Sequence, residues 1–396
     1  MKKSKIFSAS LLVGGTAIGA GMLALPVSTG GGGFWPACLI YLVCWAFMAA
    51  TGLLLLEACL WLPRDSNIIS LASHLLGKKG KMVSWVLYLF LFYCLTVAYA
   101  AGGGGFVKTI LGPEFPASVA ILIFVLIFSP LVYIGTRTVD RFNVILMAGL
   151  AVSFIVFIAI GVGGVQTARL ERVDWPMAIL ALPIIFTSFS YQGIVPSMTS
   201  YFAQNGKQVR TVILIGSFLP LVVYVIWEYL ILGLVPVEGP NGLLMSQAAG
   251  HTAVIPLKHF VSSPYIYALG QAFAFFALTT SFLGVTLGLF DFMADGLKMK
   301  KKGWQKPYLF SLVFLPPTII AMLNPNIFIS ALRYAGGIGC ALLLGLLPVL
   351  MVWSGRYRKK LSSAHRQLPG GKAVLTLLAL FVLFELIVEF AGELAG

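Results

Sequence analysis

The chain has 396 residues, of which 59% are apolar and only 10% are Asp, Glu, Lys or Arg. A water-soluble domain carries about 25% charged residues and could not bury this much apolar surface in one core, so the composition excludes an ordinary soluble protein and predicts that lipid surrounds most of the chain. The formal net charge of +14 does not indicate a nucleic-acid partner, because the basic residues form short clusters between apolar runs rather than one face.

Apolar runs long enough to cross a bilayer follow one another along the whole chain. Crossing takes about 20 residues, and the runs predict an all-α polytopic membrane protein with about eleven transmembrane helices. We expect spans near 8–29, 34–61, 83–107, 117–136, 142–164, 176–202, 211–235, 264–295, 307–323, 327–353 and 372–392. The basic start of the chain runs into the first apolar stretch without a clear small-residue cleavage site, so this stretch is predicted to be a span rather than a cleaved signal peptide.

The loops between these spans alternate in charge. Most of the 27 Lys and Arg residues fall in loops on the same side as the N-terminus, with clusters at 78–81, 298–306 and 356–372. The positive-inside rule therefore predicts a cytoplasmic N-terminus. On that side, residues 67–80 are predicted to form a short interfacial helix that ends at Gly77, whereas 243–263 is predicted to be a long outer loop that covers the outer vestibule.

The first span has poor helix chemistry. It contains Gly14, Gly15, Gly19, Gly21 and Pro26, and each Gly in a helix interior costs about 1 kcal/mol relative to Ala. Small residues also allow transmembrane helices to pack closely. The density of glycine around Thr16 nevertheless favours an interrupted helix, in which freed backbone groups can approach a ligand.

The sixth span has a similar weakness, since Thr187, Ser188, Ser190, Gln192 and Pro196 interrupt an apolar run. Such polar groups must face protein or a water-filled cavity. Interruptions in spans one and six predict two five-helix repeats, 1–165 and 166–355, followed by a loop and an eleventh helix in 356–396. An odd number of helices inverts the second repeat, and interrupted spans at matching positions of inverted repeats indicate a transporter binding site.

A broken helix offers N–H groups that favour a carboxylate and carbonyls that favour a cation, so an amino acid zwitterion fits both. We expect the N–H groups of Gly19, Ala20 and Gly21 to hold the α-carboxylate. The ammonium is expected at carbonyls near Thr16, Ala17, Phe186 and Ser188. Rings in the predicted side-chain pocket suit an aromatic or large apolar substrate, and helix packing is the alternative role of its members Tyr93, Thr96, Tyr99, Phe189, Gln192 and Leu283.

Several segments resemble one known family. Residues 14–26, GGTAIGAGMLALP, resemble the opening signature of the hydroxy/aromatic amino acid permeases, the bacterial tyrosine- and tryptophan-specific transporters. Residues 186–189 with Pro196 and Ser197 resemble that family's sixth span, 287–297 its eighth and 334–337 its tenth. The resemblance implies the leucine-transporter-type fold of five plus five inverted helices, a bacterial cytoplasmic-membrane location, and uptake of an aromatic amino acid, with tyrosine first, by ion symport. Gln192 departs from the family pattern, which has His there.

The sequence leaves two alternatives for the coupling ion, sodium and the proton. Related sodium symporters place the ion between the first break and two hydroxyls of the eighth span, and Thr280 and Ser281 resemble that pattern, with the carbonyls of Gly15 and Ile18 opposite. Proton coupling would instead use intramembrane carboxylates, which are functional candidates by default; here these are Glu57, Glu228, Asp291 and Glu385. Arg333 is an alternative partner for Glu228. On family grounds the proton is preferred to sodium.

Other classes of membrane protein lack their motifs. The five cysteines make no metal-ligand spacing, and the four histidines fall in loops. Neither a nucleophile triad nor a Walker loop is apparent. We therefore expect no enzyme activity, no nucleotide-driven pump and no cofactor. A pseudo-repeat within one chain also disfavours a channel built from a ring of subunits. The expected partners are the substrate, the coupling ion and lipid, and a monomer is expected.

Overall fold

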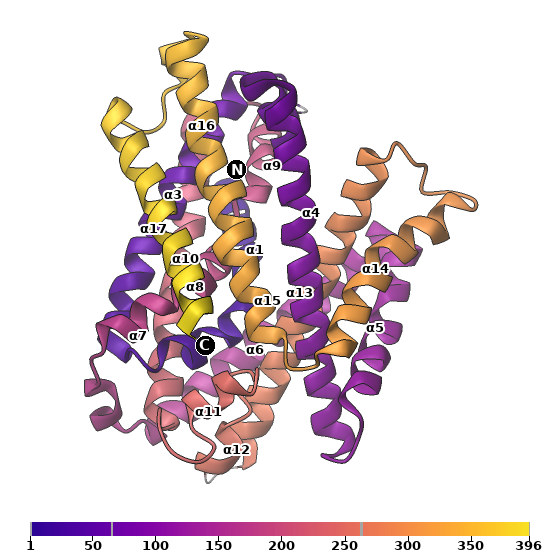
Figure 1. The fold of residues 1–396 in the computed structure, drawn as a ribbon, viewed down its shortest axis with the longest axis vertical. Helices are drawn as coiled ribbons and strands as arrows, with labels where there is room; N and C mark the ends of the chain where they lie inside the picture. Colours follow the sequence, from indigo (N-terminus) through magenta and orange to yellow (C-terminus); the bar gives the residue numbers. More distant parts are fainter. Residues whose placement is uncertain (1, 65, 262–263, 396) are drawn as a thin grey trace.

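The structure is a computed structural model that describes residues 2–64, 66–261 and 264–395. These residues form helices and connecting loops, and none of them lies in a strand. Within the described ranges, nine helices are long and apolar enough to cross a membrane. Each coincides with a predicted span, and the two other predicted spans, the first and the sixth, are the interrupted ones (Figure 1). The predicted all-α architecture is therefore confirmed.

Most of the predicted spans are single helices. These are α3 (Phe34–Leu60), α4 (Ile68–Leu111), α5 (Ala117–Ile134), α6 (Thr136–Gly161), α10 (Gly206–Leu234), α13 (Pro264–Gly296), α14 (Gln305–Leu323) and α17 (Gly371–Ala395). The tenth span changes its winding along its length, from α15 (Phe328–Tyr334) through the π-helical η5 (Ala335–Leu346) to α16 (Leu347–Trp353) and the π-helical η6 (Ser354–Arg358).

The first and sixth spans break where glycine and polar residues crowd them. The first consists of α1 (Lys2–Ala17), η1 (Ala20–Leu23) and α2 (Leu25–Thr29). At its break, Gly19 has extended backbone angles, φ −163° and ψ −152°. The sixth consists of α7 (Trp175–Leu180), α8 (Leu182–Ser188), η4 (Gln192–Ile194) and α9 (Val195–Tyr201). Prolines at the starts of α8 and α9 suit these new helix beginnings, since a first-turn residue needs no N–H partner.

The predicted interfacial helix is present as the beginning of α4. The Asn67 side chain accepts a hydrogen bond from the Ser70 N–H at 2.8 Å and starts the helix. Gly77 then bends the chain with φ +80°, a conformation that favours glycine. The helix continues beyond the bend as the third span, because Lys78 onward is again helical.

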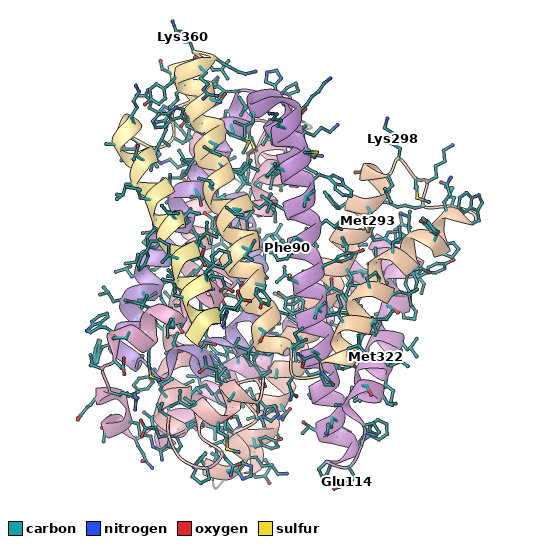
Figure 2. The ribbon with its side chains drawn as sticks, in the orientation of Figure 1. Phe90, Glu114, Met293, Lys298, Met322 and Lys360 are labelled. Carbon is teal, nitrogen blue, oxygen red and sulfur yellow. The ribbon has the colours of Figure 1, made fainter. Side chains whose placement is uncertain are left out.

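The two ends of the bundle differ in charge. Figure 2 shows Lys298 and Lys360 at one end, which we call the basic end, and Glu114 at the other, the opposite end. The short helices α11 (Leu243–Ala248) and α12 (Leu257–Phe260) of the predicted outer loop lie at the opposite end (Figure 1). There the Ala253 N–H donates to the Leu23 carbonyl at 2.9 Å, so the described part of this loop covers the first span. Positions 262 and 263 of the predicted loop lie outside the described residues.

Two groups of helices enclose the interior. One group packs α1 and α3 along α10, with α8 and α9 against α3; in the other, α4 packs against α5, α13 and α14. Contacts between α6 and α13 and between η1 and α13 join the groups. The two breaks lie in the first group, and the first break contacts α13 of the second through η1. The remaining short elements, η2 (Val162–Gly164), η3 (Thr167–Glu171) and η7 (Ser363–His365), are in loops.

Candidate functional site

Tyr224 of α10 joins the two breaks. Its hydroxyl lies 2.6 Å from the Ala17 carbonyl at the end of α1 and 2.7 Å from the Ser188 carbonyl at the end of α8. The side chain is 0% exposed. A tyrosine hydroxyl has one hydrogen, so it can donate to only one of these carbonyls at a time, and the other can accept from another donor. The two carbonyls predicted to hold an ammonium are therefore held together by a residue that sequence reasoning missed, because a tyrosine in an apolar span gives no local signal.

The break of the first span touches α13. The Ala20 N–H donates to Ser281 Oγ at 2.9 Å, so a predicted coupling residue binds a predicted carboxylate-binding amide. A Cβ on Gly19 would collide with the same Oγ, and a Cβ on Gly21 would lie 3.0 Å from Ser188 Oγ. The glycines thus allow neighbouring helices to approach the unwound backbone closely. Thr280, the other predicted hydroxyl, donates to Ala277 of its own helix at 3.1 Å.

The hydroxyls of three other predicted residues donate to carbonyls of their own helices. Thr16 donates to the Val13 carbonyl at 2.7 Å, Thr96 to Phe92 at 2.8 Å, and Ser188 to Ile184 at 3.0 Å. Phe189 places its ring against Tyr41 and Tyr224, with centroid distances of 6.1 and 5.0 Å. Buried rings therefore surround the second break, as expected for a pocket with aromatic walls. The two carbonyl positions predicted for an ion belong to the first break. Gly15 lies in the last turn of α1, and Ile18 follows the end of that helix.

Two predicted substrate-binding residues, Tyr93 and Phe186, have their side chains elsewhere. The Tyr93 hydroxyl donates to the Leu312 carbonyl of α14 at 2.8 Å. Phe186 stacks on Phe47 of α3 with centroids 5.2 Å apart and contacts Phe381 of α17. Both side chains occupy helix–helix contacts. For Tyr93 this is the packing role that was the alternative to a pocket, whereas Phe186 was predicted to contribute its carbonyl.

Gln192 binds α3 rather than facing the first break. Its Nε2 lies 3.1 Å from Thr51 Oγ1 and 3.3 Å from the Met48 carbonyl, while its Oε1 accepts from the Tyr191 N–H at 3.0 Å. The amide is 0% exposed and satisfies backbone groups that the helix break leaves free. Its direction follows from the backbone angles at the break, which the amino-acid sequence alone does not reveal.

Glu228 is buried among hydroxyls. Its Oε1 accepts from Thr29 of α2, and its Oε2 accepts from Tyr41 of α3 at 2.7 Å. The suggested pairing of Arg333 with Glu228 is wrong, because Arg333 Nε lies 3.1 Å from Glu389 Oε1 of α17. The end of α15 lies beside α17, since the next residue, Tyr334, also binds a carboxylate of that helix, Glu393.

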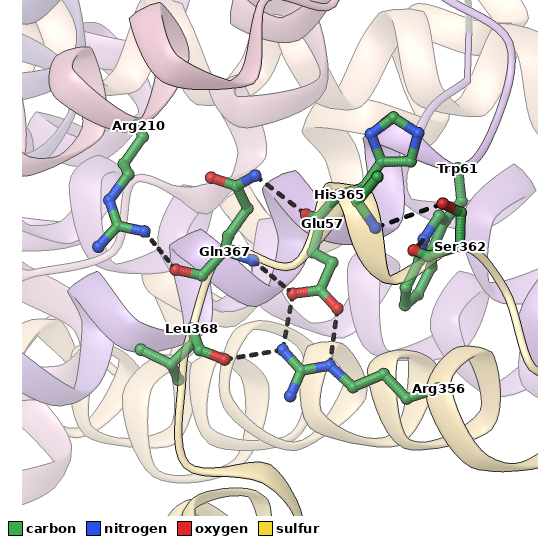
Figure 3. Close-up of polar contacts among 9 residues, drawn as sticks. Glu57, Trp61, Arg210, Arg356, Ser362, His365, Gln367 and Leu368 are labelled. Atoms are coloured by element: carbon green, nitrogen blue, oxygen red, sulfur yellow. Dashed lines mark hydrogen bonds and ion pairs between the residues drawn. The ribbon is translucent and has the colours of Figure 1, made fainter.

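Glu57 forms a buried ion pair at the basic end (Figure 3). Its two oxygens accept from Arg356 Nε and Nη2, each at 2.7 Å, and Oε2 also accepts from the Gln367 N–H at 2.8 Å. The side chains of Glu57 and Arg356 are 1% and 4% exposed. Arg356 was assigned to a loop, and this is corrected: it lies in η6, which extends the tenth span. Another predicted proton carrier, Asp291, pairs with exposed Lys301 at 2.6 Å.

A cavity of about 720 Å³ reaches from the basic end to the sixth-span break. Its lining includes Gly193 of the break and the basic residues Arg64, Lys81 and Lys298. Its walls include a stack of rings, in which Tyr88 and Phe292 have centroids 4.7 Å apart and Trp85 and Phe292 5.6 Å apart. An aromatic molecule leaving the break toward the basic end would pass these rings.

A smaller cavity of about 360 Å³ lies at the opposite end, between α4, α13 and the covering loop. Lys108, His251, Lys258 and His259 are among its lining residues, which gives it a cationic wall. Burial, reinforced by the charge of Lys108, lowers the pKa of His251 below its usual 6.5. The loop between α11 and α12 therefore favours a neutral His251.

Comparison with known proteins agrees with this geometry. The tryptophan/tyrosine permease family matches residues 2–388. The tryptophan-specific transport protein of Haemophilus influenzae is 31% identical over 410 residues, covering 99% of this chain and 97% of that protein. Tyrosine-specific transport system 1 of the same organism is 34% identical over 391 residues, covering 97% and 96%.

The fold has a solved counterpart in MhsT, whose crystal structure in complex with L-phenylalanine superposes with a TM-score of 0.68 and 15% identity, covering 97% of this chain and 98% of that one. At this identity the likeness shows the fold, which is the leucine-transporter type with interrupted first and sixth helices. Since the family match spans nearly the whole chain and the relatives are transport proteins, the chain is a multi-pass permease rather than an enzyme, and it belongs to the tryptophan/tyrosine permease family.

Proposed function

We propose that this permease imports an aromatic amino acid, tyrosine before tryptophan, across the bacterial cytoplasmic membrane, with its N-terminus in the cytoplasm. The observation that carries the proposal is the pair of helix breaks joined through Tyr224, where the Ala17 and Ser188 carbonyls meet. Unwound backbone at mid-span offers both N–H and carbonyl groups to a zwitterion, which needs both. The repeats 1–165 and 166–355, with 356–396 as an addition, belong to the same proposal.

An aromatic side chain is supported by the surroundings of the breaks. Phe189 and Tyr41 flank the second break, and Trp85, Tyr88 and Phe292 line the path to the basic end. Ring faces and edges favour offset or edge-to-face contact with another ring. The relatives described above are named for tryptophan and tyrosine transport. A site that hydrogen-bonds the tyrosine hydroxyl would reject phenylalanine, because a buried polar group of the site would then lose its partner. The alternative substrate is tryptophan or another large neutral amino acid.

In alternating access, the binding site opens to one side of the membrane at a time, and the two ends of this structure differ in that respect. The larger cavity opens at the basic end, which the positive-inside rule assigns to the cytoplasm. At the opposite end the loop around Ala253 covers the first span. We therefore assign this conformation to the stage at which substrate leaves toward the cytoplasm, and the loop to the role of an outer lid.

For coupling, the proton is preferred to sodium. Of the carboxylates, Glu57 is held by Arg356, whereas the described partners of Glu228 are the hydroxyls of Thr29 and Tyr41, which it can bind with or without its own proton. In the sodium alternative, Thr280 and Ser281 together with the carbonyls of Gly15 and Ile18 would coordinate the ion as cargo.

The test is uptake into proteoliposomes of purified protein. Radiolabelled tyrosine is supplied with an imposed inward proton gradient or sodium gradient, and unlabelled tyrosine, tryptophan, phenylalanine and leucine are competitors. Accumulation under the proton gradient alone, competed best by tyrosine, is the expected result. Accumulation only with sodium would transfer coupling to Ser281 and Thr280. No uptake of any aromatic amino acid by folded protein would refute the proposed substrate.

A further inference from the structure

A carboxyl group lies in the seam between the last helix and the π-helical part of the tenth span. On α17, the buried residues Leu378, Val382, Glu385 and Val388 recur every three or four positions and form the face toward the bundle. Glu385 occupies the middle of this face and is 0% exposed. A helix at the edge of a membrane protein needs no carboxylate to pack, so its presence there calls for a chemical role.

Neither oxygen of Glu385 has a hydrogen-bond partner among the described residues. The titratable groups close to it are thiols and one carboxyl: Cys44 of α3, Cys340 of η5 and Glu389 one turn further along α17. Arg333, on the neighbouring tenth span, binds Glu389. The other helices packed on α17, which are α7, α8 and α16, have no charged residue in their sequences.

An ionised carboxylate in such surroundings would be very costly, because the side chain is fully buried and no cation lies beside it among the described residues, whereas the neutral acid loses far less on burial. Glu389 differs, since Arg333 balances its charge. We propose that Glu385 is a proton-binding site of the transporter and carries its proton in this conformation. The proposal rests on the proposed proton coupling and names the group that takes part in it.

The seam is connected to the sixth-span break. Cys340 lies beside Ser190, a residue of that break. Next to it, Thr187 Oγ1 donates to the Leu332 carbonyl at 2.7 Å, and a Cβ on Gly336 would collide with the Pro183 carbonyl. The tenth span therefore packs directly on α8.

The tenth span can change its winding in this region. π-helical turns inside α-helices are frequent at functional sites, and η5 is π-helical over Ala335–Leu346. Loss of the Glu385 proton would require η5 and α17 to separate so that water can enter between them. Because the tenth span packs on α8, this separation would also move the tenth span relative to the sixth-span break. Proton binding at Glu385 and movement of α8 are thereby linked.

Glu385→Gln tests the proposal, because the amide resembles the neutral acid but cannot release a proton. An inward gradient of one pH unit can sustain about a tenfold accumulation when one proton accompanies each substrate molecule. With the membrane potential clamped, wild-type proteoliposomes should reach this level with tyrosine or tryptophan. The variant should still exchange labelled for unlabelled substrate but lose the accumulation, with a ratio near one.

Glu393→Gln is the matched control, since Glu393 lies on the same helix, is exposed and binds Tyr334. It should accumulate substrate like the wild type. Accumulation by Glu385→Gln that responds to the proton gradient as the wild type does would overturn the inference. Failure of the wild type to take up any aromatic amino acid would instead refute the proposed function.

Infrared spectroscopy keeps the inference testable if the glutamine variant does not fold. The folded wild type at neutral pH should show a protonated carboxyl band that is insensitive to bulk pH and that shifts in Glu385→Asp. A wild-type spectrum without any such band would also overturn the inference.

Discussion

The buried ion pair between Glu57 and Arg356 predicts a large loss of stability when either partner is removed. It joins the end of α3 to the end of the tenth span, and the loop that follows is bound to the same place through the Gln367 N–H (Figure 3). Glu57→Gln removes the negative charge and leaves Arg356 buried with a positive charge and one fewer strong acceptor. Arg356→Gln leaves the opposite charge behind.

The magnitude follows from burial. Removing one partner of a buried pair costs about 3–5 kcal/mol, whereas replacing both with groups of similar volume is often neutral. The geometry here is bidentate at 2.7 Å, and both side chains are almost fully buried, so screening by solvent gives little relief. Each single variant should therefore lose stability by about 3 kcal/mol or more, and Glu57→Gln/Arg356→Gln should lose clearly less than the two losses added.

The assay is thermal unfolding of the purified protein in one detergent, followed by the fraction that remains monodisperse. Because unfolding of a membrane protein is often irreversible, all variants are compared at one heating rate. Glu238→Gln is the matched control: Glu238 pairs with Arg172, but their side chains are 68% and 29% exposed, so a loss of no more than about 1 kcal/mol is expected. Single variants at positions 57 and 356 that melt like this control would refute the reasoning.

Three further predictions concern the breaks and the loop. Tyr224→Phe removes a hydrogen bond of about 1 kcal/mol and should weaken tyrosine binding about fivefold in a scintillation proximity assay, with unchanged folding; unchanged affinity would contradict the bridging role. Gly19→Ala should destabilise the protein by about 1–3 kcal/mol through the collision with Ser281 Oγ. Ser281→Ala in the same chain should relieve this loss, because Ser281 Cβ lies 3.7 Å from the added methyl position, and a double variant as unstable as Gly19→Ala would count against that contact. Since the pKa of His251 is lowered, the closed loop loses stability as the pH falls below about 6.5. Opening of residues 243–261, measured as amide exchange corrected for its intrinsic dependence on pH, should therefore increase on acidification, and His251→Gln should make the corrected opening nearly independent of pH; an equal pH response in both proteins would refute this.

Much of the architecture is encoded locally and could be predicted. Span positions depend on the length and apolarity of consecutive residues, so the predicted 34–61 and 264–295 agree closely with α3 and α13. The two breaks were also predictable, because the conformational preferences of Gly19 and Pro196 act within a few residues. Gly77 ended the interfacial helix as expected for the same reason.

The partners of the polar side chains could not be predicted in this way. Arg356 lies 299 residues from Glu57, and Tyr224 lies 207 residues from Ala17, so neither pair has a local pattern. The charge of Arg356 was counted as a loop signal, although helical winding through η6 turns it inward.

Composition and periodicity thus determined which segments cross the membrane and where two of them unwind, since both depend on short-range solvation and backbone preference. Only the tertiary structure decided that Gln192 binds α3, that Tyr224 joins the breaks and that Glu385 finds no hydrogen-bond partner in the described part of the chain. Those outcomes depend on which faces of distant helices meet, and the direction of a side chain at a break depends on a few backbone angles that packing selects.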